Sequence, residues 1–71
     1  MNGSPDEFAD YFQHPGDELL YIVEGQIDLD LDGDIIELSP GDAVTYDGLL
    51  PHRTRRRGQG PTRILIVTQR L

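Results

Sequence analysis

The dipeptide Asp32-Gly33 is the feature that most limits how this chain can fold. It separates QIDLDL, in which apolar and acidic residues alternate, from the apolar run DIIEL. An Asp-Gly pair between such runs is the strongest short-range signal for a β-hairpin, because both turn positions must accept positive φ angles. Residues 26–38 are therefore predicted to form an antiparallel hairpin.

The first strand of this hairpin has two different faces. Its isoleucine and leucines point to one side, while Asp28, Asp30 and Asp32 point to the other. A calcium loop would need a glycine and a distal glutamate at spacings that this segment lacks. We therefore expect a half-buried strand whose aspartates lie in water.

The rest of the chain repeats this pattern of short strands and turns. Turn residues occur at Ser39–Asp42, Asp47-Gly48 and Gly58–Pro61, and no helical period extends beyond about 10 residues. Strands at such short intervals predict an all-β fold, either a small antiparallel barrel or a sandwich. The expected strands are ADYFQ, ELLYIVEG, QIDLDL, DIIEL, AVTY, HRTRR and TRILIVTQ.

The size of the chain limits its stability. It has 71 residues and no cysteine, so it can form one domain at most, without a disulfide or a thiolate metal site. A domain of this size buries only roughly 60% of its unfolded surface, so we expect a homodimer rather than a monomer. Residues 1–9 lack any periodicity and are expected to be a flexible leader, followed by the barrel at 10–71.

Charge is divided sharply along the chain. All thirteen acidic residues lie between Asp6 and Asp47, all six arginines lie between Arg53 and Arg70, and the net charge is −7. An acidic surface repels phosphate backbones, so direct nucleic-acid binding by this chain is not expected. The run HRTRRRG could hold an anion or an acidic partner. We favour a strand whose exposed, alternating arginines pair with the opposite charges of the acidic strands beside it.

The lengths of the apolar runs indicate whether the chain can cross a membrane. The longest, LLYIV and ILIV, are far shorter than the ~20 residues that a membrane span needs. No charged-then-apolar leader opens the chain, so we expect a soluble, cytoplasmic protein without membrane contact.

His14, Glu18 and His52 are the residues best suited to chemistry. Two imidazoles and one carboxylate can form a facial triad with open positions for iron, manganese, nickel or zinc. Strand parity allows this arrangement. If Glu18 points inward, Leu20 and Ile22 share its face and line an apolar pocket.

These residues resemble the cupins, which are small double-sheet barrels of the jelly-roll kind, also called double-stranded β-helices. The first cupin motif has two histidines separated by one residue, then three or four residues and a glutamate, then six residues and a glycine. His14, Glu18 and Gly25 match the second histidine, the glutamate and the glycine, and Gly41 and His52 match the second motif. The resemblance covers roughly residues 10 to 69. It implies a cupin barrel that is dimeric and can exchange strands between subunits.

The chain departs from the cupin motifs at several positions. Phe12 replaces the first histidine, and Asp47, Leu49 and Arg56 replace the proline, glycine and asparagine of the second motif. Three of the four family ligand positions therefore remain, at His14, Glu18 and His52. They could hold a divalent metal (Fe, Mn, Ni or Zn), or the histidines could be hydrogen-bonding residues of a metal-free pocket, which is the interpretation we favour.

Within the family, the chain is most similar to the short cupin domains at the C-terminal end of XRE-type helix-turn-helix transcription regulators. The segments HPGDELLYIVEG, LSPGDAVTYDG and LPHRTRRRG carry this similarity. In those regulators the barrel senses a small molecule and supports dimerisation, while a separate helical domain reads DNA. Nothing before Asp10 can form that domain, so we expect a fragment, a tailless relative or a minimal barrel.

Three functions follow from this resemblance. We favour a sensory barrel in which Arg56 binds the carboxylate of a small organic acid or amino-acid-like ligand. The alternatives are a metal-dependent dioxygenase or isomerase, with the metal held by His14, Glu18 and His52, and a structural barrel that dimerises through Leu19, Tyr21 and Val23. The expected ligand-binding residues are Phe12, His14, Glu18, Leu20, Tyr46, His52 and Arg56.

Overall fold

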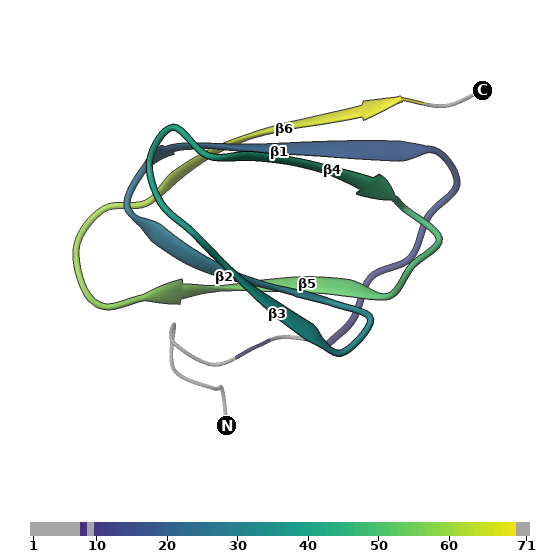
Figure 1. Cartoon of the computed structure of the whole chain (residues 1–71), viewed down its shortest axis with the longest axis horizontal. Helices are drawn as coiled ribbons and strands as arrows, with labels where there is room; N and C mark the ends of the chain where they lie inside the picture. The colour runs from purple at the N-terminus through teal and green to yellow at the C-terminus, as the bar shows by residue number, and fades with distance from the viewer. Residues whose placement is uncertain (1–7, 9, 70–71) are drawn as a thin grey trace.

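The computed structural model describes residue 8 and residues 10–69, which form two facing β-sheets (Figure 1). Both sheets are antiparallel and three-stranded, with the strand orders β4-β1-β6 and β3-β2-β5. This confirms the predicted all-β, double-stranded β-helix. Among the described residues, no helix is long and apolar enough to cross a membrane. The strands are β1 (Asp17–Glu24), β2 (Gln26–Leu31), β3 (Asp34–Leu38), β4 (Ala43–Asp47), β5 (His52–Arg57) and β6 (Arg63–Gln69).

The predicted hairpin joins β2 to β3. Its last cross-strand pair is Leu31 with Asp34, so the turn consists of Asp32 and Gly33 alone. Their φ angles are 50° and 95°, the left-handed values that this type of two-residue turn requires. The Asp-Gly signal therefore identified the turn of this hairpin.

The core lies between the two sheets. Glu18, Leu20 and Ile22 are buried on the inner face of β1, as strand parity predicted, while Tyr21 and Val23 are exposed on its outer face. Across the interior, β2 contributes its apolar face. The buried hydrophobic residues are Leu20, Ile22, Ile27, Leu29, Leu38 and Tyr46.

The expectation that the β2 aspartates lie in water was wrong for two of them. Asp28 and Asp30 are only 4% and 3% exposed. Arg55 stands opposite Asp28 and Arg53 opposite Asp30, and the Nε–Oδ2 distances are 2.9 and 2.8 Å. The arginines of β5 therefore form ion pairs with the acidic strand, as expected, but they are half-buried and cover its carboxylates.

The segment before β1 does not form the expected strand. Among Asp10 to Gln13, only Phe12 pairs with a strand, through backbone hydrogen bonds with His52. Side chains of this segment instead contact the ion pairs between β5 and β2, Arg53–Asp30 and Arg55–Asp28, which we call the arginine ladder. The Tyr11 hydroxyl donates to Oδ2 of Asp30 at 2.7 Å, and the Phe8 ring lies 4.8 Å from the guanidinium carbon of Arg53. Residues 10–13 therefore pack against β5 without forming a strand. Phe8 is the only described residue of the expected leader at 1–9.

Candidate functional site

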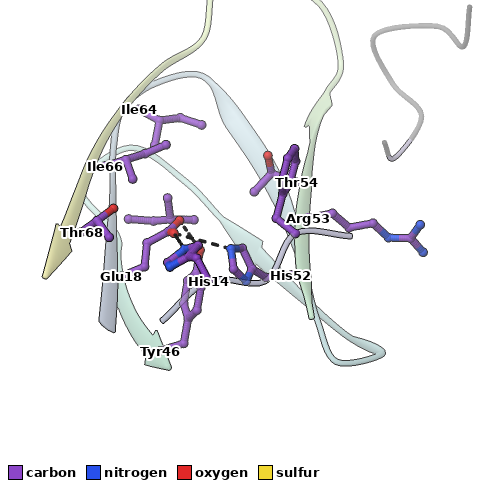
Figure 2. A pocket seen from close by; sticks show the side chains of 11 residues that line it. His14, Glu18, Tyr46, His52, Arg53, Thr54, Ile64, Ile66 and Thr68 are labelled. Carbon is purple, nitrogen blue, oxygen red and sulfur yellow. Dashed lines mark hydrogen bonds and ion pairs between the residues drawn. The ribbon is translucent and has the colours of Figure 1, made fainter. Parts of the chain in front are cut away.

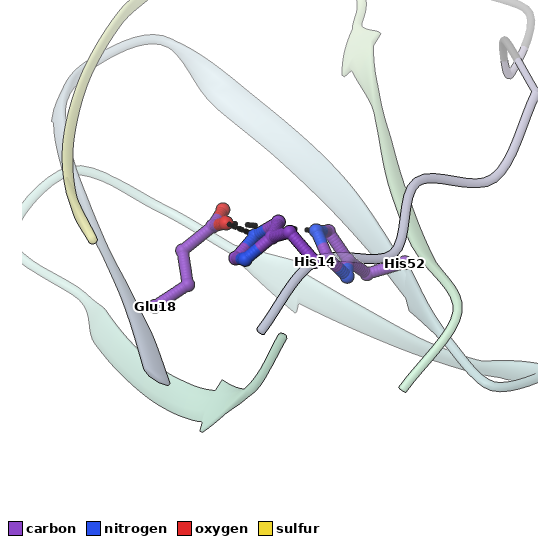
Figure 3. Close-up of side chains that lie close together, drawn as sticks. All are labelled: His14, Glu18 and His52. Carbon is purple, nitrogen blue, oxygen red and sulfur yellow. Dashed lines mark hydrogen bonds and ion pairs between the residues drawn. The ribbon is translucent and has the colours of Figure 1, made fainter. Parts of the chain in front are cut away.

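Three side chains that could ligate a metal meet at one end of the barrel (Figure 3). His14 comes from the loop before β1, Glu18 from β1, and His52 from the start of β5. Oε1 of Glu18 lies 2.6 Å from Nε2 of His14 and 3.5 Å from Nε2 of His52. One ligating atom from each residue lies within 4.8 Å of the others. The structure therefore brings together the three ligand positions chosen from the sequence.

The backbone sets the orientation of both imidazole rings. Nδ1 of His52 lies 2.8 Å from the carbonyl oxygen of Leu50, and Nδ1 of His14 makes a longer contact, 3.3 Å, with that of Pro15. Since a carbonyl oxygen can only accept, Nδ1 of His52 carries the proton, and the Nε2 atoms of both rings are directed at Glu18. Metal-binding histidines are commonly held this way by their second nitrogen.

The contact between His14 and Glu18 requires a proton between Nε2 and Oε1, because both atoms would otherwise be acceptors. Metal binding to such groups displaces protons. A divalent cation is thus a natural substitute for this proton, and the donor set of two imidazoles and one carboxylate fits Fe²⁺, Mn²⁺, Ni²⁺ or Zn²⁺. Phe12, at the position of the missing family histidine, contributes no ligand.

Tyr46 on β4 fixes the other oxygen of the carboxylate. Its hydroxyl donates to Oε2 of Glu18 at 2.6 Å. Burial, together with this hydrogen bond to a carboxylate, raises the pKa of Tyr46 far above its usual value. The phenol therefore remains a proton donor and leaves Oε1 of Glu18 facing the two histidines.

Gly48 determines the position of His14. A Cβ atom at residue 48 would overlap Cε1 and Nδ1 of the His14 ring and would lie 2.6 Å from the Gly16 carbonyl oxygen. The Gly48 backbone also accepts a hydrogen bond from the N–H of His14 and donates one to the carbonyl of Gly16. The Asp47-Gly48 pair was recognised in the sequence as a turn, but its role in holding His14 was not.

The cluster lies at the polar end of a cavity of about 380 Å³ (Figure 2). Six of the seven expected ligand-binding residues line it, and their binding role stays a prediction. Sequence analysis missed five others. Three of them lie on β6, whose pairing with β1, which places Ile66 beside Leu20, has no local signal in the sequence. The cavity is lined by Phe12, His14, Glu18, Leu20, Tyr46, His52, Arg53, Thr54, Ile64, Ile66 and Thr68.

Arg56 does not belong to this cavity. It lines a separate surface pocket with Asp28, Arg55, Arg57 and Gly58. Parity does place Arg56 on the same strand face as His52, but four residues of extended chain separate the two by about 13 Å. The expectation that Arg56 binds a ligand carboxylate in the cavity therefore finds no support in its placement.

The two facing sheets and the histidine–carboxylate cluster together define a cupin-type barrel. The chain belongs to the Cupin_2 family of cupin domains, whose match spans residues 3–68. No curated protein sequence matches the chain.

The solved structures that share its fold include the following three. The Cupin_2 domain of an XRE family transcriptional regulator from Enterobacter cloacae aligns with a TM-score of 0.78 and 22% identity, covering 89% of this chain and 68% of that one. A putative sugar phosphate isomerase from Acidithiobacillus ferrooxidans has a TM-score of 0.71 and 25% identity, covering 87% and 40%. The iron(II) form of HppE in complex with substrate has a TM-score of 0.72 and 23% identity, covering 89% and 36%. The present chain thus covers less than half of the last two structures.

Proposed function

We propose that this cupin domain binds a divalent metal ion through His14, Glu18 and His52 and recognises a small molecule beside it, as the effector-sensing part of a transcription regulator. The observation that carries this proposal is the position of the ligand cluster. It closes the polar end of a cavity whose remaining wall is largely apolar. A concave apolar site with a few convergent polar groups is the usual form of a small-molecule site.

The lining of the cavity indicates the kind of ligand. Its apolar wall includes Leu20, Ile64 and Ile66, whereas the polar groups gather around Glu18. Arg53 also lines the cavity, but its guanidinium points outward and binds Asp30 (Figure 2). The best fit is a small molecule with a carboxylate or hydroxyl head near the cluster and a short branched or cyclic apolar body. A bound metal would offer a Lewis-acid site for that oxygen head.

Sensing is favoured over catalysis by how the titratable groups of the cavity are used. His14, Tyr46 and His52 all contact Glu18, and the Tyr46 phenol stays protonated. Among the described residues that line the cavity, no carboxylate or imidazole lies outside this cluster. A general acid or base for substrate would therefore have to come from the metal ligands themselves. The high structural similarity to a regulator's cupin domain supports the same choice.

A metal-dependent dioxygenase or isomerase is the second candidate. Three protein ligands leave coordination positions open, as catalytic metal sites do. One of the similar structures is an iron(II) protein with bound substrate, and another is a putative sugar phosphate isomerase. Turnover of a bound small molecule would favour this candidate, and reversible binding without turnover would favour the sensor.

Calorimetric titration tests the proposed function. The metal-loaded chain is titrated with branched-chain 2-hydroxy and 2-keto acids, and the metal-free chain serves as the reference. Thr54→Phe should fill the cavity and abolish ligand binding while metal binding persists, since Thr54 lines the cavity and is not a ligand. Thr45→Phe places the same side chain at an exposed position outside the cavity and should bind like the parent. Equal binding by the Thr54→Phe variant would contradict the proposal.

A further inference from the structure

Strand β6 forms one edge of its sheet and is apolar on both faces. Leu65 and Val67 on the outer face are 53% and 47% exposed, and Ile66 on the inner face is 55% exposed. Strands that are apolar on both faces are normally buried inside a sheet. An exposed strand of this kind is a template for pairing with another strand.

The other three edge strands carry the charges that usually prevent such pairing. Strand β3 has Asp34 and Glu37, β4 ends at Asp47, and β5 bears the arginine ladder. From Ile64 to Gln69, β6 has no charged residue. Charged side chains on edge strands are a common means of blocking association. Within the described part of the chain, β6 is the edge strand with the longest uncharged run.

We propose that β6 pairs with β6 of a second copy of this chain, antiparallel and centred on Ile66. This register places Ile66 opposite Ile66 of the second copy, Leu65 opposite Val67, and Ile64 opposite Thr68. Directly opposed residues share a face in an antiparallel pair, so the inner and outer faces of the two sheets match. Arg63, the one charged residue of β6, then faces Gln69, and no like charges are opposed. The strand is thus complementary to itself, which identifies the second copy as its partner.

Pairing through β6 would join the two three-stranded sheets into one continuous sheet with a twofold axis between the β6 strands. On its outer face, Tyr21 and Leu65 would continue into Val67 and Leu19 of the second copy. On its inner face, Ile66 lines the cavity and is more than half exposed. Ile66 of the second copy would lie beside it and supply a missing part of the cavity wall, so the dimer would complete the ligand site.

Cysteine cross-linking tests the register, since the chain has no cysteine of its own. Ile66→Cys should form a disulfide-linked dimer under mild oxidation, because Cβ atoms of opposed residues lie close to disulfide range. Leu65→Cys alone and Val67→Cys alone should cross-link slowly, whereas a mixture of the two should cross-link efficiently. Equal cross-linking of Leu65→Cys alone and Ile66→Cys would overturn the register, as would efficient cross-linking only through Tyr21→Cys on the sheet face.

Sedimentation equilibrium of the full chain tests the dimer itself. The parent should be a dimer, and Ile66→Lys should raise the dissociation constant by about 100-fold or more, since two lysines would face each other across the axis. The matched variant Ile35→Lys adds a lysine at another exposed edge-strand isoleucine and should leave the dimer intact. A monomeric parent, or equal weakening by both variants, would overturn the proposal. Cross-linking of the cysteine variants keeps the test independent of how well Ile66→Lys folds.

Discussion

The hydroxyl of Tyr46 donates to Oε2 of Glu18 at 2.6 Å, while Oε1 of the same carboxylate faces His14 and His52. One carboxylate thus has a buried side held by a phenol and an open side held by two imidazoles. Residues that bind a metal ligand from behind set its orientation and basicity. Tyr46 is therefore a positioning residue for the candidate metal site.

Changing Tyr46 to phenylalanine should weaken metal binding by about 10- to 100-fold, the usual effect of losing a hydrogen bond to a metal ligand. The ring would still fill the core, but a buried carboxylate oxygen would lose its donor, so the loss of folding free energy should be about 1–3 kcal/mol. Calorimetric titration with Zn²⁺ and Mn²⁺ measures the first effect and urea unfolding the second. Tyr21→Phe, on the outer face of the same sheet, should change neither. Unchanged metal affinity in Tyr46→Phe would remove Tyr46 from the site.

Gly48→Ala should impair the metal site by moving His14. The new methyl group overlaps the His14 ring and crowds the Gly16 carbonyl, so the ring must leave its position. Metal affinity is expected to fall at least 10-fold, roughly the effect of misplacing one ligand. Gly41→Ala is the control, because its Cβ meets no atom within 4 Å although its φ of +92° also disfavours alanine. Equal loss of affinity in both variants would show a general effect on folding instead.

Arg55→Ala should destabilise the barrel more than removal of an ordinary surface arginine. Arg55 covers the buried carboxylate of Asp28, which would keep its ion pair with Arg57. Because the Arg55 side chain is itself 38% exposed, we expect a loss of about 1–2 kcal/mol, below the value for a fully buried pair. Arg63→Ala, at a side chain 74% exposed, should stay within about 0.5 kcal/mol of the parent. Urea unfolding at pH 7 compares the two variants. Similar unfolding midpoints would contradict a stabilising role of the Arg55–Asp28 ion pair.

Acid should weaken the fold through Asp30. The hydrogen bond from Tyr11, followed by those from Arg53 and the backbone of Gly33, lowers the pKa of Asp30 below its usual value near 3.8. A carboxylate with a lowered pKa in the folded state stabilises the protein above its ordinary pKa, and this contribution is lost as the pH falls through the folded pKa. Stability should therefore drop below about pH 4. The drop between pH 7 and pH 3 should be smaller in Tyr11→Phe than in the parent or in Tyr21→Phe. An identical pH dependence in all three proteins would argue against this role of Tyr11.

Local sequence signals were sufficient for the six strands from Asp17 onward and for the turns between them, but they also predicted a strand before Asp17 that does not form. Asp32-Gly33 identified a hairpin because its turn needs two positive φ angles, and alternation on β1 placed Glu18, Leu20 and Ile22 inward. The cupin spacing then brought His14, Glu18 and His52 together, although they come from a loop and two different strands.

Errors arose where a residue's surroundings depend on strands distant in the sequence. Alternation on β2 could not show that Arg53 and Arg55 would cover Asp30 and Asp28, because that depends on the register with β5. Similarly, parity predicted that Arg56 lies on the inner face of its strand, but parity gives no information on how far Arg56 lies from the cluster. Tyr11 looked like part of a strand because aromatic residues favour strands, whereas its hydroxyl binds Asp30.

Elemental analysis of the purified chain tests the central claim most directly. The protein is stripped with a chelator, reloaded separately with iron, manganese, nickel and zinc, and compared with the variant His52→Ala. The account predicts about one equivalent of metal per chain in the parent and its loss in the variant, since two remaining ligands do not retain a catalytic-type ion. No stoichiometric metal in the parent, or full retention by His52→Ala, would show that His14, Glu18 and His52 do not form a metal site.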